Sequence, residues 1–370
     1  MTTPTPTSGV HGCDIRLETR PPAPRTRPGS GTVIDLHCHY LNREVETTVA
    51  AIARPAPPPL SAPAAQSAAY NAELIRSAYA PKLSDIEVRL ADMDAMGVDI
   101  QALSPSPTQY YYWLDLEQSR AIVRAQNERI AEVCARYPDR LVGLGTVALQ
   151  HPQLAAEQVH HAVVELGLRG FEISSHVEGV SIADARFAPF WQQVEQLNVM
   201  VLLHPLGTTI GPRLDTHYLS NLVGQPAETA IALSHLIMDG HFDRYPTLKL
   251  CAVHGGGYLP LYMGRSDHAY AMRPECSCCA NRPSDYLRRI WFDTVVYDSE
   301  HLRRLIDVVG IDRVVLGTDY PFDMGDYDPH GLIEAVAGLS AADRAAILGG
   351  NARDLLALPA RQGVKETKTS

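Results

Sequence analysis

Two histidines one residue apart end the first strongly apolar run of this chain, residues 33–39 with the sequence VIDLHCH. On a β-strand the side chains alternate between faces, so His37 and His39 point the same way and Cys38 points the opposite way. Two neutral imidazoles that converge at a strand end can form half of a site for a divalent metal ion. The pattern alone is ambiguous, because two unrelated polar residues at a strand end have the same spacing.

Three further side chains able to bind a metal end later apolar runs at the same relative position. His204 follows VLL at residues 201–203, His254 ends CAVH before three glycines, and Asp319 ends VVLGTD. Each of them, taken alone, reads as a hydrogen-bonded structural residue. Parallel barrel strands bring their C-terminal ends to one rim, so the five side chains together predict a shared metal site. Three or four nitrogen and oxygen ligands indicate a catalytic ion, Zn2+ first, with Mn2+ or Co2+ as alternatives.

The candidate ligands are positioned by an alternation of apolar, β-prone runs and segments with helical periodicity. Eight such runs occur, at residues 33–37, 98–104, 141–149, 168–174, 198–204, 248–254, 290–296 and 313–318. The clearest helical segments cover residues 84–97, 116–137, 152–166, 183–197, 228–240 and 299–309, and the first opens with the capping-box pattern Ser84-x-x-Glu87. The alternation predicts an α/β fold, a (β/α)8 TIM-type barrel, with a doubly wound open sheet as the competing arrangement.

Segments outside this alternation set the expected domain limits. Residues 1–31 are rich in Pro, Thr, Arg and Gly and predict a disordered leader; residues 32–359 form the expected barrel domain and residues 360–370 a C-terminal tail. The connection at residues 40–81 is unusually long and includes a Pro-rich stretch at residues 54–60. We expect it to be a lid or a subunit arm, and an ordered surface excursion without function is the alternative.

Composition narrows the classes of partner and compartment. The 370 residues are 45% hydrophobic and 20% charged, as in a soluble globular protein, and the net charge of −10 comes without a basic cluster. These features argue against nucleic acid or an anionic membrane as the main partner, and no apolar run approaches the ~20 residues of a membrane helix. Seven cysteines without framework spacing indicate reduced thiols and a cytoplasmic location.

The combined motifs resemble the decarboxylase branch of the amidohydrolase superfamily. The motifs are the paired histidines, HP at residues 204–205, HGGG at residues 254–257 and GTDYPF at residues 317–322, and the resemblance runs from about residue 33 to residue 358. It implies that His37, His39, His204 and Asp319 bind zinc. It also implies that His254 and Asp319 are catalytic, with His254 acting as the base without binding the metal. Members of this branch lack the lysine that bridges two metal ions in many relatives. This chain agrees, because its fourth predicted strand, residues 168–174, contains no lysine.

The resemblance further implies that two arginines hold a small-molecule carboxylate substrate. The matching residues are Arg89 and Arg265, and Arg265 would reach the site of a neighbouring subunit, which requires a homodimer. Judged from the residues alone, Arg89 is more typical of an exposed helix arginine and Arg265 of an inter-helix salt bridge.

The implied activity is metal-dependent, non-oxidative removal of CO2 from a carboxymuconate semialdehyde or a related hydroxyaromatic carboxylate in aromatic catabolism. A hydrolase or a hydratase that uses the same site is the alternative. The chain departs from the family where tryptophans are expected to shape the pocket, because Leu206, His217 and Asn221 occupy those positions. Aromatic residues 110–113 can supply pocket walls in their place, and loop packing is the competing interpretation.

Overall fold

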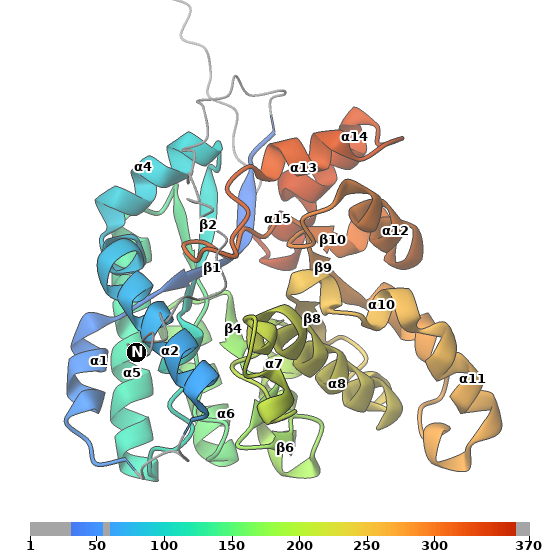
Figure 1. The fold of residues 1–370 in the computed structure, drawn as a ribbon, viewed down its shortest axis with the longest axis horizontal. Helices are drawn as coiled ribbons and strands as arrows, with labels where there is room; N and C mark the ends of the chain where they lie inside the picture. Colours follow the sequence, from blue (N-terminus) through green and yellow to red (C-terminus); the bar gives the residue numbers. More distant parts are fainter. Residues whose placement is uncertain (1–30, 55–59, 360–370) are drawn as a thin grey trace, which may run out of the picture.

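Eight parallel strands form a closed barrel with helices around it (Figure 1). The computed structural model describes residues 31–54 and 60–359. The barrel strands are β1 (Ile34–Tyr40), β2 (Ile100–Pro105), β3 (Leu141–Gly143), β4 (Gly170–Ile173), β7 (Met200–Leu203), β8 (Lys249–Ala252), β9 (Ile290–Asp293) and β10 (Val314–Val315). Each lies within one of the predicted apolar runs or extends it by a few residues. A short antiparallel hairpin, β5 (His176–Val177) and β6 (Val180–Ser181), follows β4.

Two seams join the three strands β1-β2-β3 to the five strands β10-β9-β8-β7-β4. At the first seam, Leu36 N donates to Leu316 O at 2.9 Å and His39 N donates to Tyr320 O at 2.8 Å. At the second seam, Gly145 N donates to Gly170 O at 2.8 Å. The sheet therefore closes on itself, which confirms the predicted barrel and makes the open-sheet alternative wrong.

The helices of the described residues include all six helical segments that the sequence predicts, and several that it does not. They are α1 (Arg43–Ala50), α2 (Ala62–Leu74), α3 (Ala80–Ser84), α4 (Ile86–Met96), α5 (Leu116–Arg136), α6 (Pro152–His160), α7 (Ala188–Gln196), α8 (Gln225–Met238), α9 (His241–Arg244), α10 (Leu259–Tyr262), α11 (Gly264–Met272), α12 (Ser299–Val309), α13 (Pro329–Ala335), α14 (Ala341–Ala345) and α15 (Asn351–Leu355). Helix α12 illustrates the driving force, because Leu302, Leu305, Ile306 and Val309 form one buried stripe. No helix in the described ranges has the length and apolarity needed to cross a membrane.

The predicted capping box at Ser84 is wrong by one residue. Ser84 ends α3, and the N-cap of α4 is Asp85, whose side chain accepts a hydrogen bond from Glu87 N at 3.0 Å. An aspartate next to a serine offers the same capping chemistry, so the sequence pattern could not decide between the two positions.

The long connection after β1 is mostly helical and reaches the C-terminal mouth of the barrel. It contains α1, α2, a π-helical turn at Ile75–Tyr79 and α3. Helix α2 buries none of its residues, so it has no apolar stripe from which the sequence could predict it. The Pro-rich residues 55–59, residues 1–30 of the predicted leader and the tail at 360–370 lie outside the described residues. The predicted domain limits stay a prediction.

Candidate metal centre

The five predicted side chains converge at the C-terminal mouth of the barrel. His37 and His39 come from the end of β1, and the other three follow the ends of β7, β8 and β10. The ring centroid of His37 lies 5.1 Å from that of His39, 5.0 Å from that of His204 and 5.4 Å from that of His254. One potential ligand atom from each of His37, His204, His254 and Asp319 lies within 4.8 Å of the others. His39 joins this group through Asp319, because His39 Nε2 lies 3.0 Å from Asp319 Oδ1.

The Nδ1 atoms of the three predicted histidine ligands face oxygen atoms behind them. His37 Nδ1 lies 2.7 Å from Asp293 Oδ2, and His204 Nδ1 donates to Pro205 O at 2.8 Å. His39 Nδ1 lies 3.5 Å from Glu172 Oε2. A proton held on Nδ1 leaves the lone pair of Nε2 free, which is how proteins orient histidine toward a metal. Asp293 is also anchored itself, since its Oδ1 accepts from Gly255 N at 2.8 Å.

In the described part of the chain, four imidazole nitrogens of this cluster are buried without a hydrogen-bond partner: Nδ1 of His39, Nδ1 of His254 and two Nε2 atoms. The two Nε2 atoms belong to His37 and His204. A buried polar atom that stays unsatisfied costs about 1–3 kcal/mol, so native structures rarely leave several of them together. A divalent cation would satisfy both Nε2 atoms, and imidazole nitrogens with one carboxylate are a common zinc donor set. The residues present therefore fit a divalent metal ion.

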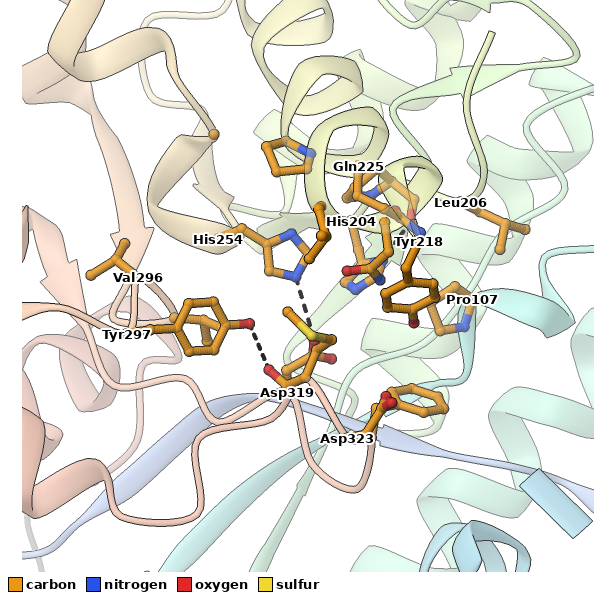
Figure 2. A pocket seen from close by; sticks show the side chains of 18 of the residues that line it. Pro107, His204, Leu206, Tyr218, Gln225, His254, Val296, Tyr297, Asp319 and Asp323 are labelled. Atoms are coloured by element: carbon orange, nitrogen blue, oxygen red, sulfur yellow. Dashed lines mark hydrogen bonds and ion pairs between the residues drawn. The ribbon is translucent and has the colours of Figure 1, made fainter. Parts of the chain in front are cut away.

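Asp319 carries the negative charge of the cluster. Its Oδ1 lies 3.4 Å from His37 Nε2, and its Oδ2 lies 3.4 Å from His254 Nε2 (Figure 2). Burial raises the pKa of Asp319, but His37, His254 and His39 lower it more, so the net pKa is well below the usual range. Burial and the neighbouring imidazoles lower the pKa of His204 well below its usual range. The acid is thus ionised and His204 neutral, the states in which each can bind a metal. Burial lowers the pKa of His39, but Glu172 and Asp319 raise it more, to about 10.

His254 and Asp319 both adopt a left-handed backbone conformation that is uncommon outside glycine. Their φ angles are 54° and 56°. Such conformations in non-glycine residues gather at functional sites, where the surrounding fold enforces them. After His254 the chain passes very close to α8, because a Cβ on Gly257 would lie 2.1 Å from Pro226 O. Gly257 therefore allows backbone to approach backbone at the pocket wall.

A pocket of about 470 Å³ opens above this cluster. His204, His254 and Asp319 line its floor, and aromatic and apolar side chains form much of its wall (Figure 2). The excursion after β1 contributes Asn71, Ile75 and Tyr79 to the lining. Asn71 is in α2, and Ile75 and Tyr79 are in the π-helical turn after it, so this part of the excursion forms part of the pocket wall.

Arg89 does not line the pocket. Its side chain is fully buried, and its guanidinium donates to Gln101 Oε1 at 2.9 Å, to Lys82 O at 3.2 Å and to His39 O. The expectation of an exposed helix arginine is therefore wrong, because α4 packs this face against β1 and β2. In this conformation Arg89 supports the strand that carries His39, and its predicted contact with a substrate carboxylate stays a prediction.

Arg265 lies exposed at the start of α11, away from the pocket of its own chain. It forms no ion pair with any described residue, so the inter-helix salt bridge expected from the residues alone is absent there. Helices α10 and α11 project from the side of the barrel in Figure 1. The predicted contact with a neighbouring subunit stays a prediction.

The sequence predicts only some of the residues that form the pocket walls. Leu206 and Asn221, two of the positions where the family carries tryptophan, do line the pocket. Tyr110 and Tyr112 are buried and stacked on one another with ring centroids 5.5 Å apart, so loop packing is the correct interpretation for these two. The aromatic walls instead come from Tyr79, Tyr218, Tyr258, Tyr297 and Phe322. These residues lie mostly in irregular segments without a periodic signal that could have marked them.

Comparison with known proteins gives a consistent set of relatives. Residues 34–358 match the Amidohydrolase family. A 2-amino-3-carboxymuconate-6-semialdehyde decarboxylase from Dictyostelium discoideum is 36% identical over 276 residues, which cover 74% of this chain and 77% of the relative. A gamma-resorcylate decarboxylase from Rhodococcus jostii is 31% identical over 295 residues, covering 75% and 89%.

Several solved structures with the same fold are decarboxylases as well. A 5-carboxyvanillate decarboxylase from Sphingomonas paucimobilis has a TM-score of 0.78 at 25% identity, covering 89% of this chain and 99% of that one. A 5-carboxyvanillate decarboxylase from Novosphingobium aromaticivorans, complexed with manganese and 4-hydroxy-3-methoxy-5-nitrobenzoic acid, has a TM-score of 0.76 at 25% identity. There the match covers 89% and 97% of the two chains.

Proposed function

This chain belongs to the amidohydrolase family, and on that premise we propose that it is a metal-dependent carboxy-lyase that removes CO2 from a carboxymuconate semialdehyde or a related hydroxyaromatic acid. One observation carries the proposal. Four imidazoles and the carboxylate of Asp319 converge beneath a pocket with aromatic walls. The named activities of three of the relatives described above, decarboxylations of carboxylated unsaturated or aromatic compounds, supply the reaction class.

The proposed metal ligands are His37, His39, His204 and Asp319. The unsatisfied Nε2 atoms of His37 and His204 and the ionised carboxylate of Asp319 support this assignment. When bound, a divalent ion supplies Lewis-acid stabilisation of negative charge that develops on the substrate. We propose Zn2+ from the nitrogen-rich donor set, and Mn2+ is the alternative because a related decarboxylase structure contains it.

His254 is proposed to move the proton that the reaction requires. When the bond to the carboxylate breaks, CO2 leaves, the electron pair stays on the substrate carbon, and a proton must replace the lost group. His254 lines the pocket, and its Nε2 lies 3.4 Å from Asp319 Oδ2, which can hold the ring in position. An imidazole is the side chain best suited to give and take a proton near neutral pH.

The walls of the pocket are proposed to hold a planar, conjugated acid. Tyr218, Tyr297 and Phe322 offer flat surfaces for a ring or diene. Asn71 and Gln225 bring amide groups to the same pocket, and amides can bind hydroxyl or aldehyde oxygens. The apolar lining also keeps water from the carbon that loses CO2, which strengthens every electrostatic contact in the site.

Exchange of subunits tests the proposal that Arg265 serves a neighbouring site in a homodimer. Arg265→Ala is expected to lower kcat/KM by about 10- to 100-fold, because hydrogen bonds to a charged group contribute about 1.5–3 kcal/mol. A heterodimer of one Arg265→Ala subunit and one His254→Ala subunit is expected to regain up to half of the wild-type activity, since one of its two sites is then intact.

Arg273→Ala provides the matched control, because Arg273 follows the last turn of α11 and pairs only with Glu275 among the described residues. It is expected to stay close to wild type. A heterodimer as inactive as its two parents would contradict action across the interface, and a monomer at assay concentration would contradict the dimer itself.

An assay of CO2 release tests the function. The metal-loaded enzyme is incubated separately with 2-amino-3-carboxymuconate-6-semialdehyde, 2,6-dihydroxybenzoate and 5-carboxyvanillate, and released CO2 and the products are measured. We expect stoichiometric CO2 from at least one compound and none with the Asp319→Ala variant. A product that has gained water without losing CO2 would favour the hydratase or hydrolase alternative and contradict the proposal.

A further inference from the structure

A buried carboxylate that the proposed reaction does not use lies directly behind His39. Glu172 is on β4, its side chain is fully buried, and its Oε2 lies 3.5 Å from His39 Nδ1. It does not line the pocket, so it cannot touch a substrate there. His39 Nδ1 has no hydrogen-bond partner among the described residues, which leaves Glu172 as the acceptor closest at hand.

The other contacts of the Glu172 carboxylate are neutral hydroxyl groups. Tyr110 Oη donates to Oε1 at 2.7 Å and also lies 3.2 Å from His204 O, and the Ser104 hydroxyl donates to Oε2. Within the described part of the chain, His39 is the one partner of Glu172 that can carry a positive charge. Two hydroxyl groups satisfy hydrogen bonds but do not neutralise a buried charge.

A buried carboxylate is costly unless a positive charge accompanies it. Here the group that can carry this positive charge is the imidazole of His39. Its other nitrogen, Nε2, lies 3.0 Å from Asp319 Oδ1. A cation bound at Nε2 would place positive charge on the imidazole, and Glu172 would stabilise the proton on Nδ1. Asp293 and His37 repeat the same arrangement at 2.7 Å on the other side of the cluster.

We propose that Glu172 is a positioning residue that holds the His39 ring with Nε2 toward the metal centre and thereby sets its affinity for the ion. This inference rests on the metal centre of the proposed function. Partners of this kind behind a metal-bound histidine typically contribute 10- to 100-fold in metal affinity. The sequence offered no signal for it, because Glu172 lies in a buried apolar run far from His39 along the chain.

The test measures binding of Zn2+ by competition with a chromophoric chelator, on purified protein at fixed pH. Glu172→Gln keeps the size of the side chain, removes the charge and replaces one acceptor oxygen by an amide group that donates. The matched control is Glu228→Gln, another buried glutamate, whose Oε1 accepts from the Thr209 hydroxyl at 2.8 Å away from the cluster. Each variant is checked for its thermal unfolding temperature with and without the ion.

We expect Glu172→Gln to bind Zn2+ about 10- to 100-fold more weakly than wild type, and Glu228→Gln to bind it like wild type. A smaller loss, or an equal loss in both variants, would overturn the proposal while leaving the metal centre itself standing. Wild-type protein that does not bind Zn2+ or Mn2+ would instead overturn the proposed function. If Glu172→Gln cannot be purified folded, Glu172→Asp, which shortens the side chain by one methylene, is judged by the same threshold.

Discussion

Replacing His254 by alanine is expected to lower turnover by about 10²- to 10⁴-fold, the usual contribution of a positioned acid or base, while the metal stays bound. Turnover and metal binding are expected to respond differently because His254 contacts Asp319 at a different oxygen from the proposed ligands. His254 contacts Asp319 through Oδ2, whereas His37 and His39 approach Oδ1, so removing His254 leaves the proposed ligands and their supporting carboxylates in place. What is lost is the ring nitrogen that faces the pocket.

Metal content by elemental analysis, measured beside steady-state kinetics, checks this expectation. His235→Ala is the control, because His235 is a half-exposed histidine on α8 that pairs with Asp239 and lies outside the pocket. Unchanged turnover in His254→Ala would remove His254 from the mechanism. Loss of the metal along with the activity would show instead that His254 is a ligand, as its inclusion in the 4.8 Å group allows.

Removing the metal with a chelator is expected to abolish CO2 release and to weaken the fold. An ion that stabilises several kcal/mol of developing charge accounts for a rate loss of about 10³-fold or more. Free metal at 100 times its Kd also stabilises the folded state by about 2.7 kcal/mol, so Tm is expected to fall by several degrees in the chelated protein. Without the ion, the buried Nε2 atoms of His37 and His204 are unsatisfied again.

Adding metals back one at a time identifies the ion. Zn2+ or Mn2+ is expected to restore both activity and Tm, and Mg2+ to restore little, because three of the four proposed donors are nitrogens and Mg2+ prefers oxygen. Full activity after exhaustive chelation, verified by elemental analysis, would contradict a catalytic metal. Recovery of Tm without activity would assign the ion a structural role only.

The barrel and the candidate ligands could be predicted from sequence because both leave local signals. The strands of a parallel barrel are buried on both faces, so they appear as short apolar runs, and all seven residues of β1 are indeed buried. The strand fixes the position of a side chain that follows its C-terminal end. His204, His254 and Asp319 could therefore be recognised from the sequence.

The remainder depends on contacts between segments that are distant in sequence. Glu172 and Asp293 support the two β1 histidines from β4 and β9, and neither strand carries a pattern that marks the partner. The sequence favours an exposed helix residue at Arg89, yet the buried guanidinium donates a hydrogen bond to the carbonyl oxygen of His39 on β1. Helix α2 forms from alanine-rich sequence with a Ser61 N-cap and buries no side chain, so periodicity could not reveal it.

The seam between β1 and β10 joins residues that leave the ribosome at very different times. His39 emerges early, and its partner Asp319 follows 280 residues later. A nascent chain therefore contains its paired histidines throughout most of translation, but the proposed carboxylate ligand is added only after 318 residues have been made. If Asp319 is a metal ligand as proposed, a fragment cut before residue 319 is expected to bind the ion more weakly than the whole chain, because it lacks this carboxylate.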